Sequence, residues 1–261
     1  MNYWQKRQAK LQEELVKKSE RKIKKQLVKY YAEAAEKTIA DFEEVYNKIL
    51  KQQSEGKEVT PALLYQLDKY WQAQAQLRNE LRKLGEKQIV LLTKEFELAF
   101  FEIYFALGVE GGKAFNTIDT AMVQQLINSV WVADGKMFSQ RVWDNTERLV
   151  ETLNEQLIHV VATGRKTTDL KNALMERFNV SYNRANTLVR TELTHIQTEA
   201  AKSRYESYGV EEFEVLVDED ARTCDKCKEL IGKRFPIHGA APLPVHPNER
   251  CCIIPIVNLN T

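Results

Sequence analysis

Apolar residues recur at helical spacing through most of this chain. Residues 1–53 contain neither glycine nor proline and are rich in Lys, Glu, Gln and Ala. The apolar stripe of this segment is thin before Leu27, so a helix formed here buries little of itself alone. We therefore expect this helix either to pack on a partner or to protrude and be partly disordered.

A second long helix is predicted after a loop at residues 54–59. Thr60 and Pro61 form its start signal, because threonine caps helices and proline fits the first helical position. An apolar face then continues to the glycines of residues 108–112, which suit a helix end, with Gly85 as a weak interruption. The first two long helices are predicted to pair as an antiparallel hairpin.

Four further helices are predicted, at residues 116–130, 138–163, 167–178 and 181–208. Thr117 or Asp119 fits the start of the first of them, and Ser181 fits the cap of the last. Gly164 and Gly209 suit the ends of helices. Most of the chain before residue 210 is therefore predicted to be helical.

Proline placement marks a change of structure near residue 210. Pro61 is the only proline before Pro236, and the other five lie between Pro236 and Pro255. Proline breaks helix interiors, so this distribution separates a helical body from an irregular module. Within that module, residues 212–217 alternate like a strand, and residues 253–257 form a second candidate strand.

All four cysteines lie in this last module, as Cys224-Asp-Lys-Cys227 and Cys251-Cys252, with His246 just upstream of the second pair. A Cys-x-x-Cys knuckle followed by a histidine and a further cysteine is a ligand set for Zn²⁺, which takes four nitrogen or sulfur ligands tetrahedrally. We predict a structural zinc ion held by Cys224, Cys227, His246 and Cys251.

Other interpretations of the cysteines stay open. Disulfides are one, but the polar start of the chain predicts synthesis in a reducing cytosol, where they are rare. Free thiols and a redox pair are two more. Cys252 could replace Cys251 as a ligand, and His238 is a further candidate. A catalytic zinc would need an open position and an acid or base such as Glu249, whereas four protein ligands would close the site.

These residues predict a mainly α-helical protein with a long helical hairpin and a helical body, followed by a small α+β C-terminal module that zinc stabilises. The expected divisions are an extended N-terminal helical region at 1–115, a helical domain at 116–209, and a Cys/His metal-binding module at 210–261.

Composition narrows the function classes only slightly. Hydrophobic residues make up 43% of the 261 residues and charged residues 29%, and the net charge of +1 does not indicate nucleic-acid binding by itself. No stretch approaches the roughly 18–20 continuous apolar residues of a membrane span. The chain also lacks a phosphate-binding loop and a nucleophile elbow.

Several short motifs follow one another in a recognisable order. They are Trp131, residues 138–141, residues 164–170, Arg190-Thr191-Glu192, residues 220–227 with Asp220 and Arg222, residues 230–235, residues 244–248, and Arg250-Cys251. Together they resemble the phage minor head proteins of the Mu F-like head morphogenesis family. That family reads His-Pro-Asn-Cys-Arg-Cys near its end, whereas here Glu249 stands in place of the first cysteine.

The resemblance implies a minor virion component, present in few copies and located inside the head near the portal. It also implies a role in head morphogenesis and in DNA packaging or ejection, with the host cytoplasm as the site of assembly. The implied partners are the portal protein, the capsid and scaffold proteins, and phage double-stranded DNA. The family implies no established catalytic activity, so we expect no enzyme.

The beginning of the chain is locally basic. Nine Lys or Arg residues oppose three Glu residues between positions 6 and 25. A basic helix of this kind can contact nucleic acid or an acidic protein surface, and a solvated face is the plain alternative. The candidate contact residues for the portal or DNA are Lys17, Lys18, Arg21, Lys22, Lys24 and Lys25.

Two other functions compete with a head protein. A zinc-dependent hydrolase or nuclease-like effector delivered with the genome could use Glu192 and His195 as acid and base. Alternatively, Arg190 and Glu192 could fix the long helix against the zinc module through ion pairs. A zinc-stabilised DNA-binding protein would show strongly salt-dependent affinity as an isolated chain.

Overall fold

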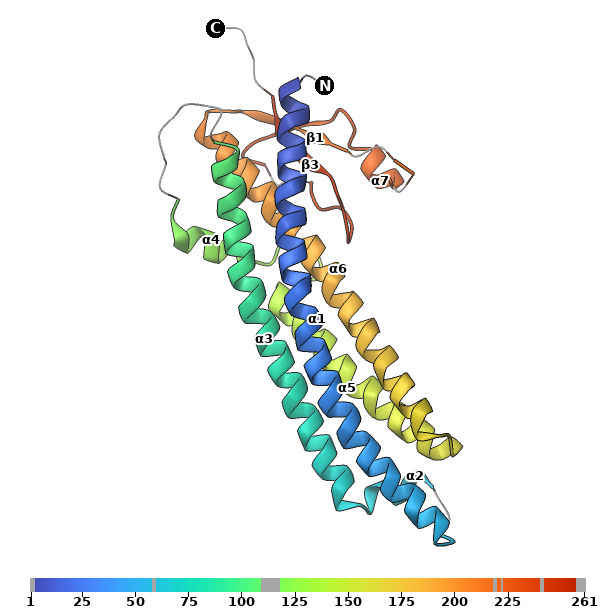
Figure 1. Ribbon diagram of the computed structural model, residues 1–261. Coiled ribbons are helices and arrows are strands. Elements are labelled where there is room, and N and C mark those ends of the chain that lie inside the picture. Colours follow the sequence, from blue (N-terminus) through green and yellow to red (C-terminus); the bar gives the residue numbers. More distant parts are fainter. Residues whose placement is uncertain are drawn as a thin grey trace. The chain divides into compact units, whose positions relative to one another are not determined.

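The computed structural model describes residues 3–57, 60–108, 118–217, 220–221, 223–239 and 242–256. These residues are mainly helical and end in a small antiparallel sheet, so the predicted fold class is confirmed (Figure 1). The helices are α1 (Tyr3–Ser54), α2 (Pro61–Tyr65), α3 (Asp68–Ala106), α4 (Thr120–Ile127), α5 (Phe138–Thr163), α6 (Thr167–Ser207) and α7 (Asp225–Lys228).

The chain forms two compact units, each assembled from segments far apart in sequence. Unit 1 draws on residues 1–23, 91–138 and 187–261, and unit 2 on residues 24–90 and 139–186. Helices α1, α3 and α6 contribute to both units. The predicted division at residues 115 and 209 follows the order of the chain instead, and it stays a prediction.

Helices α1 and α3 pair antiparallel within unit 2, as the hairpin prediction expects. Lys37 Nζ lies 3.0 Å from Glu80 Oε2, and Lys87 Nζ lies 2.9 Å from Glu33 Oε2, so the contacts run in opposite directions along the two helices. These exposed pairs contribute little stability. The buried apolar side chains between the elements of this unit supply most of it, among them Leu27, Ile39, Phe42, Val45, Ile49, Leu77, Leu81, Leu153 and Leu174.

The polar beginning of α1 packs inside unit 1. Val16 and Ile23 are buried, and so is Gln12, which is 0% exposed. The Gln12 side chain donates to the carbonyl of Ile253 at 3.0 Å and accepts from Gln197 Nε2 at 3.1 Å. Hydrogen bonding thus satisfies a buried amide that would otherwise be costly, and it compensates for the thin apolar stripe.

The predicted break near Phe178 and Ser181 is wrong, because α6 continues from Thr167 to Ser207. The side chain of Ser181 faces the core instead of capping a helix, with its Oγ 3.3 Å from Tyr31 Oη. Residues buried at helical spacing continue through this position, and no glycine or proline interrupts them. The apolar stripe therefore outweighs the capping signal of a single serine.

The helix predicted from Pro61 onward is interrupted. Pro61 does begin α2 after Thr60, but α2 ends at Tyr65 and α3 starts at Asp68. Trp71 Nε1 donates to the Tyr65 carbonyl at 3.0 Å, which satisfies a backbone group that a continuous helix would have paired. Downstream, α4 is shorter than predicted and begins at its Asp119 cap, whose side chain accepts from the Ala121 amide at 2.8 Å.

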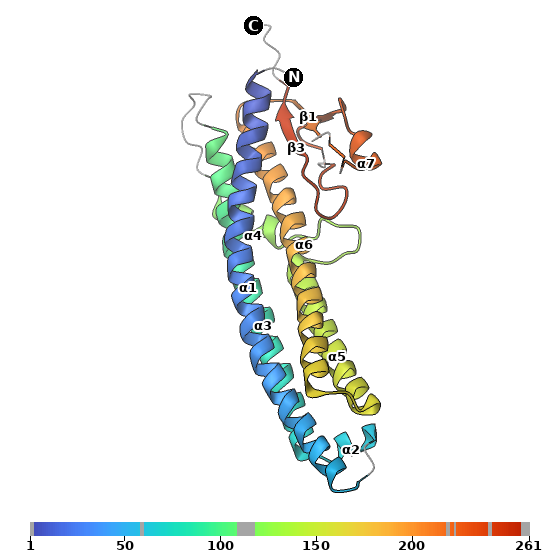
Figure 2. The same cartoon turned by 45° about the vertical axis from the view of Figure 1, so that its right-hand side comes forward.

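The sheet has the order β2-β1-β3, in strands β1 (Glu212–Leu216), β2 (Arg234–Pro236) and β3 (Cys252–Pro255). Both neighbours run antiparallel to β1, and in Figure 2 the sheet lies beside α6 with α7 next to it. β1 and β3 match the predicted strands, although Val257 lies outside the described residues. β2 escaped prediction because it has three residues and ends in proline, which is tolerated at a sheet edge.

Gly85 provides a test of packing in unit 2, because two effects oppose each other there. Alanine is favoured over glycine within a helix by about 1 kcal/mol. A methyl group at Gly85, however, would lie no more than 3.0 Å from three ring carbons of Trp143. Overpacking costs roughly 1–3 kcal/mol, so we expect Gly85→Ala to lower the free energy of unfolding by about 1 kcal/mol in urea denaturation.

The control is the same change in a Trp143→Ala background. With the ring removed, Gly85→Ala should stabilise the protein by up to about 1 kcal/mol, since only the helix propensity remains. A stabilising Gly85→Ala in the presence of Trp143 would contradict this packing.

Candidate metal centre and the helix that holds it

The first two ligand candidates lie on one tight turn. Cys224 is the N-cap of α7, and its Sγ accepts a hydrogen bond from the Cys227 amide at 3.4 Å. This bond folds the two thiols of the Cys-x-x-Cys segment to the same side. Cys227 is buried, whereas Cys224 is partly exposed. The local sequence therefore builds a preformed pair of sulfur ligands.

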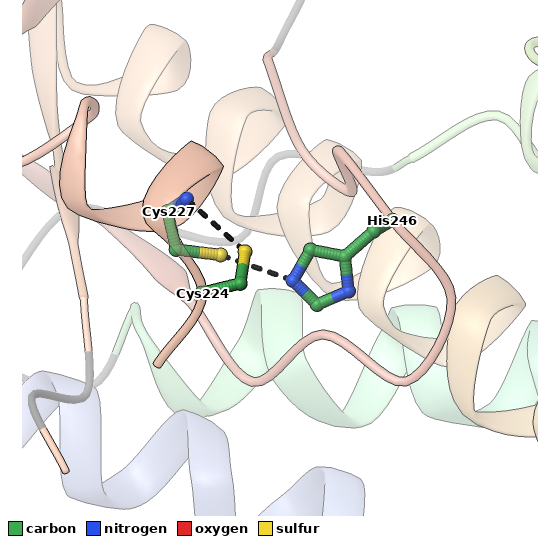
Figure 3. Close-up of side chains that lie close together, drawn as sticks. All are labelled: Cys224, Cys227 and His246. Carbon is green, nitrogen blue, oxygen red and sulfur yellow. Dashed lines mark hydrogen bonds between the residues drawn. The ribbon is translucent and has the colours of Figure 1, made fainter. Parts of the chain in front are cut away.

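His246 meets this pair from a second loop. Its Nε2 lies 3.1 Å from Cys227 Sγ, and Figure 3 shows the ring directed at the two sulfur atoms. Its Nδ1 lies 2.8 Å from the Pro247 carbonyl. A proton on Nδ1, donated to that carbonyl, leaves Nε2 as the acceptor and potential metal ligand. Cys224, Cys227 and His246 form one group whose donor atoms all lie within 4.8 Å of one another.

Cys251 belongs to a second group, which shares Cys227 and adds Glu249; its donor atoms also lie within 4.8 Å of one another. Glu249 Oε1 lies 3.7 Å from Cys227 Sγ, and Oε2 accepts from the Val245 amide. The sequence prediction left the part played by Glu249 open. Its burial against the thiols depends on how the loop folds, which no local motif reveals.

The backbone and electrostatics of this region suit a cation. Asn248 has a φ of 63°, a left-handed conformation that asparagine tolerates, and it turns the loop between His246 and Glu249. Burial, followed by hydrogen bonding to Cys224 and the charge of Glu249, raises the pKa of Cys227 to about 12. Burial and the charge of Glu249 also raise the pKa of Cys251. Such thiols become thiolates at neutral pH beside a metal cation, which displaces their protons.

The remaining candidates fall outside both groups. Cys252 lies in β3 near Tyr205, whose pKa is raised chiefly by burial and further by Cys252. His238 is mostly exposed, with its Nδ1 3.2 Å from Glu206 Oε1. Neither residue is brought to the donor atoms gathered around Cys227 in the described part of the chain.

Arg190 ties α6 to the loop at residues 244–251, here called the metal loop. Its Nε donates to the Glu249 carbonyl at 3.2 Å, and Thr194 Oγ1 donates to the same oxygen at 3.1 Å. Nη1 of Arg190 lies 3.2 Å from Glu20 Oε2 on α1. The guanidinium is therefore shared between the metal loop and the first helix.

The other two residues of the Arg190-Thr191-Glu192 motif also hold neighbouring segments. Thr191 Oγ1 accepts from the Asn248 amide at 3.3 Å, so it contacts the metal loop. Glu192 Oε2 accepts from Trp131 Nε1 at 2.9 Å. Glu192 thus contacts the segment before α5, and the role of Trp131 was not evident from its position in the sequence.

Asp220 of the C-terminal motif forms a bidentate ion pair with Arg250. The Arg250 guanidinium donates at 3.0 and 2.8 Å to the two carboxylate oxygens of Asp220. This planar pairing holds the segment before Cys224 against the metal loop. Arg222, the other predicted residue of the motif, lies outside the described residues.

These features define a mainly helical protein with a small module, attached to a long helix, whose Cys, His and Glu side chains could hold a metal. Residues 151–253 match the family described as Phage Mu protein F like protein. This match supports a Mu F-like, phage head-related protein, as the motifs predicted. The match includes Arg190-Thr191-Glu192 and the Cys/His motifs but begins after Trp131. No curated protein and no solved structure gave a match.

The structure also bears on the membrane prediction. Among the described helices, none combines the length and the apolar character that crossing a bilayer requires.

Because His195 is buried, we expect the folding stability of the protein to depend on pH. It stacks on Trp131 with ring centroids 4.3 Å apart, and burial, aided by the charge of Lys202, lowers its pKa from 6.5 to about 4. The unfolded chain therefore binds more protons than the folded chain between pH 6.5 and 4. Folding stability should fall by roughly 3 kcal/mol as the pH falls through this window.

The candidate metal ligands also take up protons in acid. The contribution of His195 is therefore measured as the difference in unfolding free energy between the wild type and a His195 variant. Urea unfolding of the wild type and of His195→Gln should be compared at each pH. The wild type should lose roughly 3 kcal/mol relative to the variant between pH 6.5 and 4, since the other titrations are common to both. Parallel pH profiles would show that His195 is not held neutral.

Proposed function

We propose that this chain is a phage minor head protein, present in few copies in the virion and associated with the portal vertex. One observation carries the proposal: the family region at residues 151–253 contains both the α6 motif and the metal loop, which contact each other through Arg190 and Glu249. The matched sequence thus includes two segments that contact each other in the folded chain. Head morphogenesis, with a part in DNA packaging or ejection, is the role proposed for it.

We further propose that the metal is zinc and that its role is structural. Sulfur and imidazole donors in a tight cluster are the ligands that Zn²⁺ prefers. In its described residues, the module between 210 and 256 has only a short three-stranded sheet and one turn of helix, so its own core is small. A bound ion would join α7 to the metal loop and supply stability that such a core cannot.

An enzymatic function is the less supported alternative. A cavity of about 350 Å³ adjoins Cys224, Cys227 and His246 and could admit a small substrate. The charged groups proposed for acid–base work are engaged elsewhere, however: Glu192 accepts from Trp131, and His195 is buried against the same ring. We therefore propose a non-enzymatic protein.

The basic residues of α1 differ in whether they already form ion pairs within the chain. Lys17, Lys18 and Lys22 face nearby carboxylates, at distances of 2.9 Å for Lys18 to Glu102 and 2.8 Å for Lys22 to Glu95. Lys24 also has an interaction within the chain. Arg21 and Lys25, one turn apart, are exposed and form no ion pair with the described residues. We propose that these two residues contact the portal, with DNA as the alternative partner.

Cys224→Ser tests the metal. This change should abolish the binding of one zinc ion per chain, measured by elemental analysis of freshly purified, reduced protein. Because the ion joins two loops, the module after residue 210 should become sensitive to protease while circular dichroism still reports the helices. Cys252→Ser, which alters a thiol outside both donor groups, should keep its zinc. Wild-type protein without zinc would contradict the proposal.

Mass spectrometry of purified virions tests the function. The wild-type chain should be present in few copies. The double variant Arg21→Glu/Lys25→Glu should be depleted from virions at least severalfold, because an acidic pair would repel the acidic surface that the basic pair contacts. The variant Lys51→Glu/Lys57→Glu makes the same charge change at exposed positions and should be retained.

Absence of the wild-type chain from virions would refute a head protein. Equal retention of both double variants would refute the contact alone. If DNA is the partner, Arg21→Glu/Lys25→Glu should instead weaken duplex binding and lower the salt slope by about 0.9 per lost phosphate contact.

A further inference from the structure

The side-chain carboxylate of Glu249 is buried, whereas Arg190 contacts only the backbone carbonyl of this residue among the contacts described. The residue is 1% exposed, and its carboxylate accepts from the Val245 amide and from Cys227 Sγ. No ion pair in the described part of the chain reaches this carboxylate. Buried carboxylates in folded proteins are paired, coordinated to a metal or protonated. One of these three states must account for the buried carboxylate of Glu249.

The geometry around Cys227 fits coordination. Its Sγ lies 3.1 Å from His246 Nε2 and 3.7 Å from Glu249 Oε1. In a tetrahedral zinc site with bonds of 2.0–2.3 Å, neighbouring donor atoms lie about 3.5 Å apart. The imidazole and the carboxylate thus stand at ligand-like separations from the same sulfur. Cys227 is common to both clusters of donor atoms, one with Cys224 and His246 and one with Glu249 and Cys251.

We infer that Glu249 is the fourth ligand, giving a site of Cys224, Cys227, His246 and Glu249, with Cys251 as a neighbouring neutral thiol. This inference rests on the metal site in the proposed function, and it replaces Cys251 in the predicted ligand set. The Val245 amide, bonded to Oε2, orients the carboxylate so that Oε1 faces the site.

Counting charge favours this set over the one with Cys251. Two thiolates and one carboxylate around a divalent ion leave one net negative charge. Three thiolates around the ion leave two if the uncoordinated Glu249 beside them is ionised, and one only if it is protonated. The second arrangement places an uncompensated charge in a buried site, which is the costly case. A neutral Cys251 avoids that charge and can donate its S–H to the carboxylate, because the two groups lie within 4.8 Å.

Cobalt substitution of the full chain counts the thiolates directly. The near-ultraviolet band from thiolate to Co²⁺ has an intensity proportional to the number of bound sulfur atoms. The band should correspond to two thiolates in the wild type and stay unchanged in Cys251→Ser. It should rise by half in Glu249→Cys, which substitutes a third thiolate for the carboxylate.

Affinity gives an independent measurement. Glu249→Gln keeps the shape of the side chain but removes its charge, and it should weaken zinc binding by roughly tenfold or more in competition with a chelator. Glu229→Gln removes a carboxylate from an exposed position beyond α7 and should leave the affinity unchanged. Circular dichroism of each variant would show that the helices persist.

The inference would be overturned if the wild-type band corresponded to three thiolates and the Cys251→Ser band to two. Cys251 would then be a ligand. Unchanged zinc affinity in Glu249→Gln would overturn it as well, since a protonated or uncoordinated Glu249 would then explain the burial. Failure of the wild type to bind either ion would refute the proposed metal site itself, which is a separate result.

Discussion

The guanidinium of Arg190 is the contact on which unit 1 depends, because three segments of the chain share it. It is carried by α6, donates to the carbonyl of Glu249 in the metal loop, and pairs with Glu20 of α1. The side chains of Arg190 and Glu20 are 11% and 17% exposed, so solvent screens their attraction only weakly. Removing one partner of such a pair typically costs about 3–5 kcal/mol.

Hydrogen bonds from α6 hold the metal loop in this arrangement. Thr191 and Thr194 add two further bonds to the metal loop, and both are supplied by the same stretch of α6 as Arg190. The candidate ligands are therefore positioned from the outside by α6, and a bound ion would position them from the inside. A motif that reads like acid–base chemistry in the sequence acts here as an attachment point.

Local and periodic features could be predicted from the sequence, and features set by tertiary contacts could not. The bounds of α5 and the antiparallel pairing of α1 with α3 followed from apolar spacing and glycine stops. The prediction of a helix cap at Ser181 was wrong because the sequence does not distinguish a capping serine from a buried one. In the fold, Ser181 Oγ lies beside the Tyr31 hydroxyl. In the site, the Cys-x-x-Cys turn was visible from its spacing, whereas the burial of Glu249 depends on how Asn248 turns the loop.

The hydrogen bond from Gln12 to the Ile253 carbonyl joins residues 241 positions apart. During synthesis on the ribosome the first turns of α1 are made early, yet their buried partners in α6 and β3 emerge near the end. Until then Gln12 and the thin apolar stripe around it lack the surface that covers them in the folded protein. Unit 1 can therefore close only after β3 has been made, so a chain stalled before β3 would display the beginning of α1 uncovered.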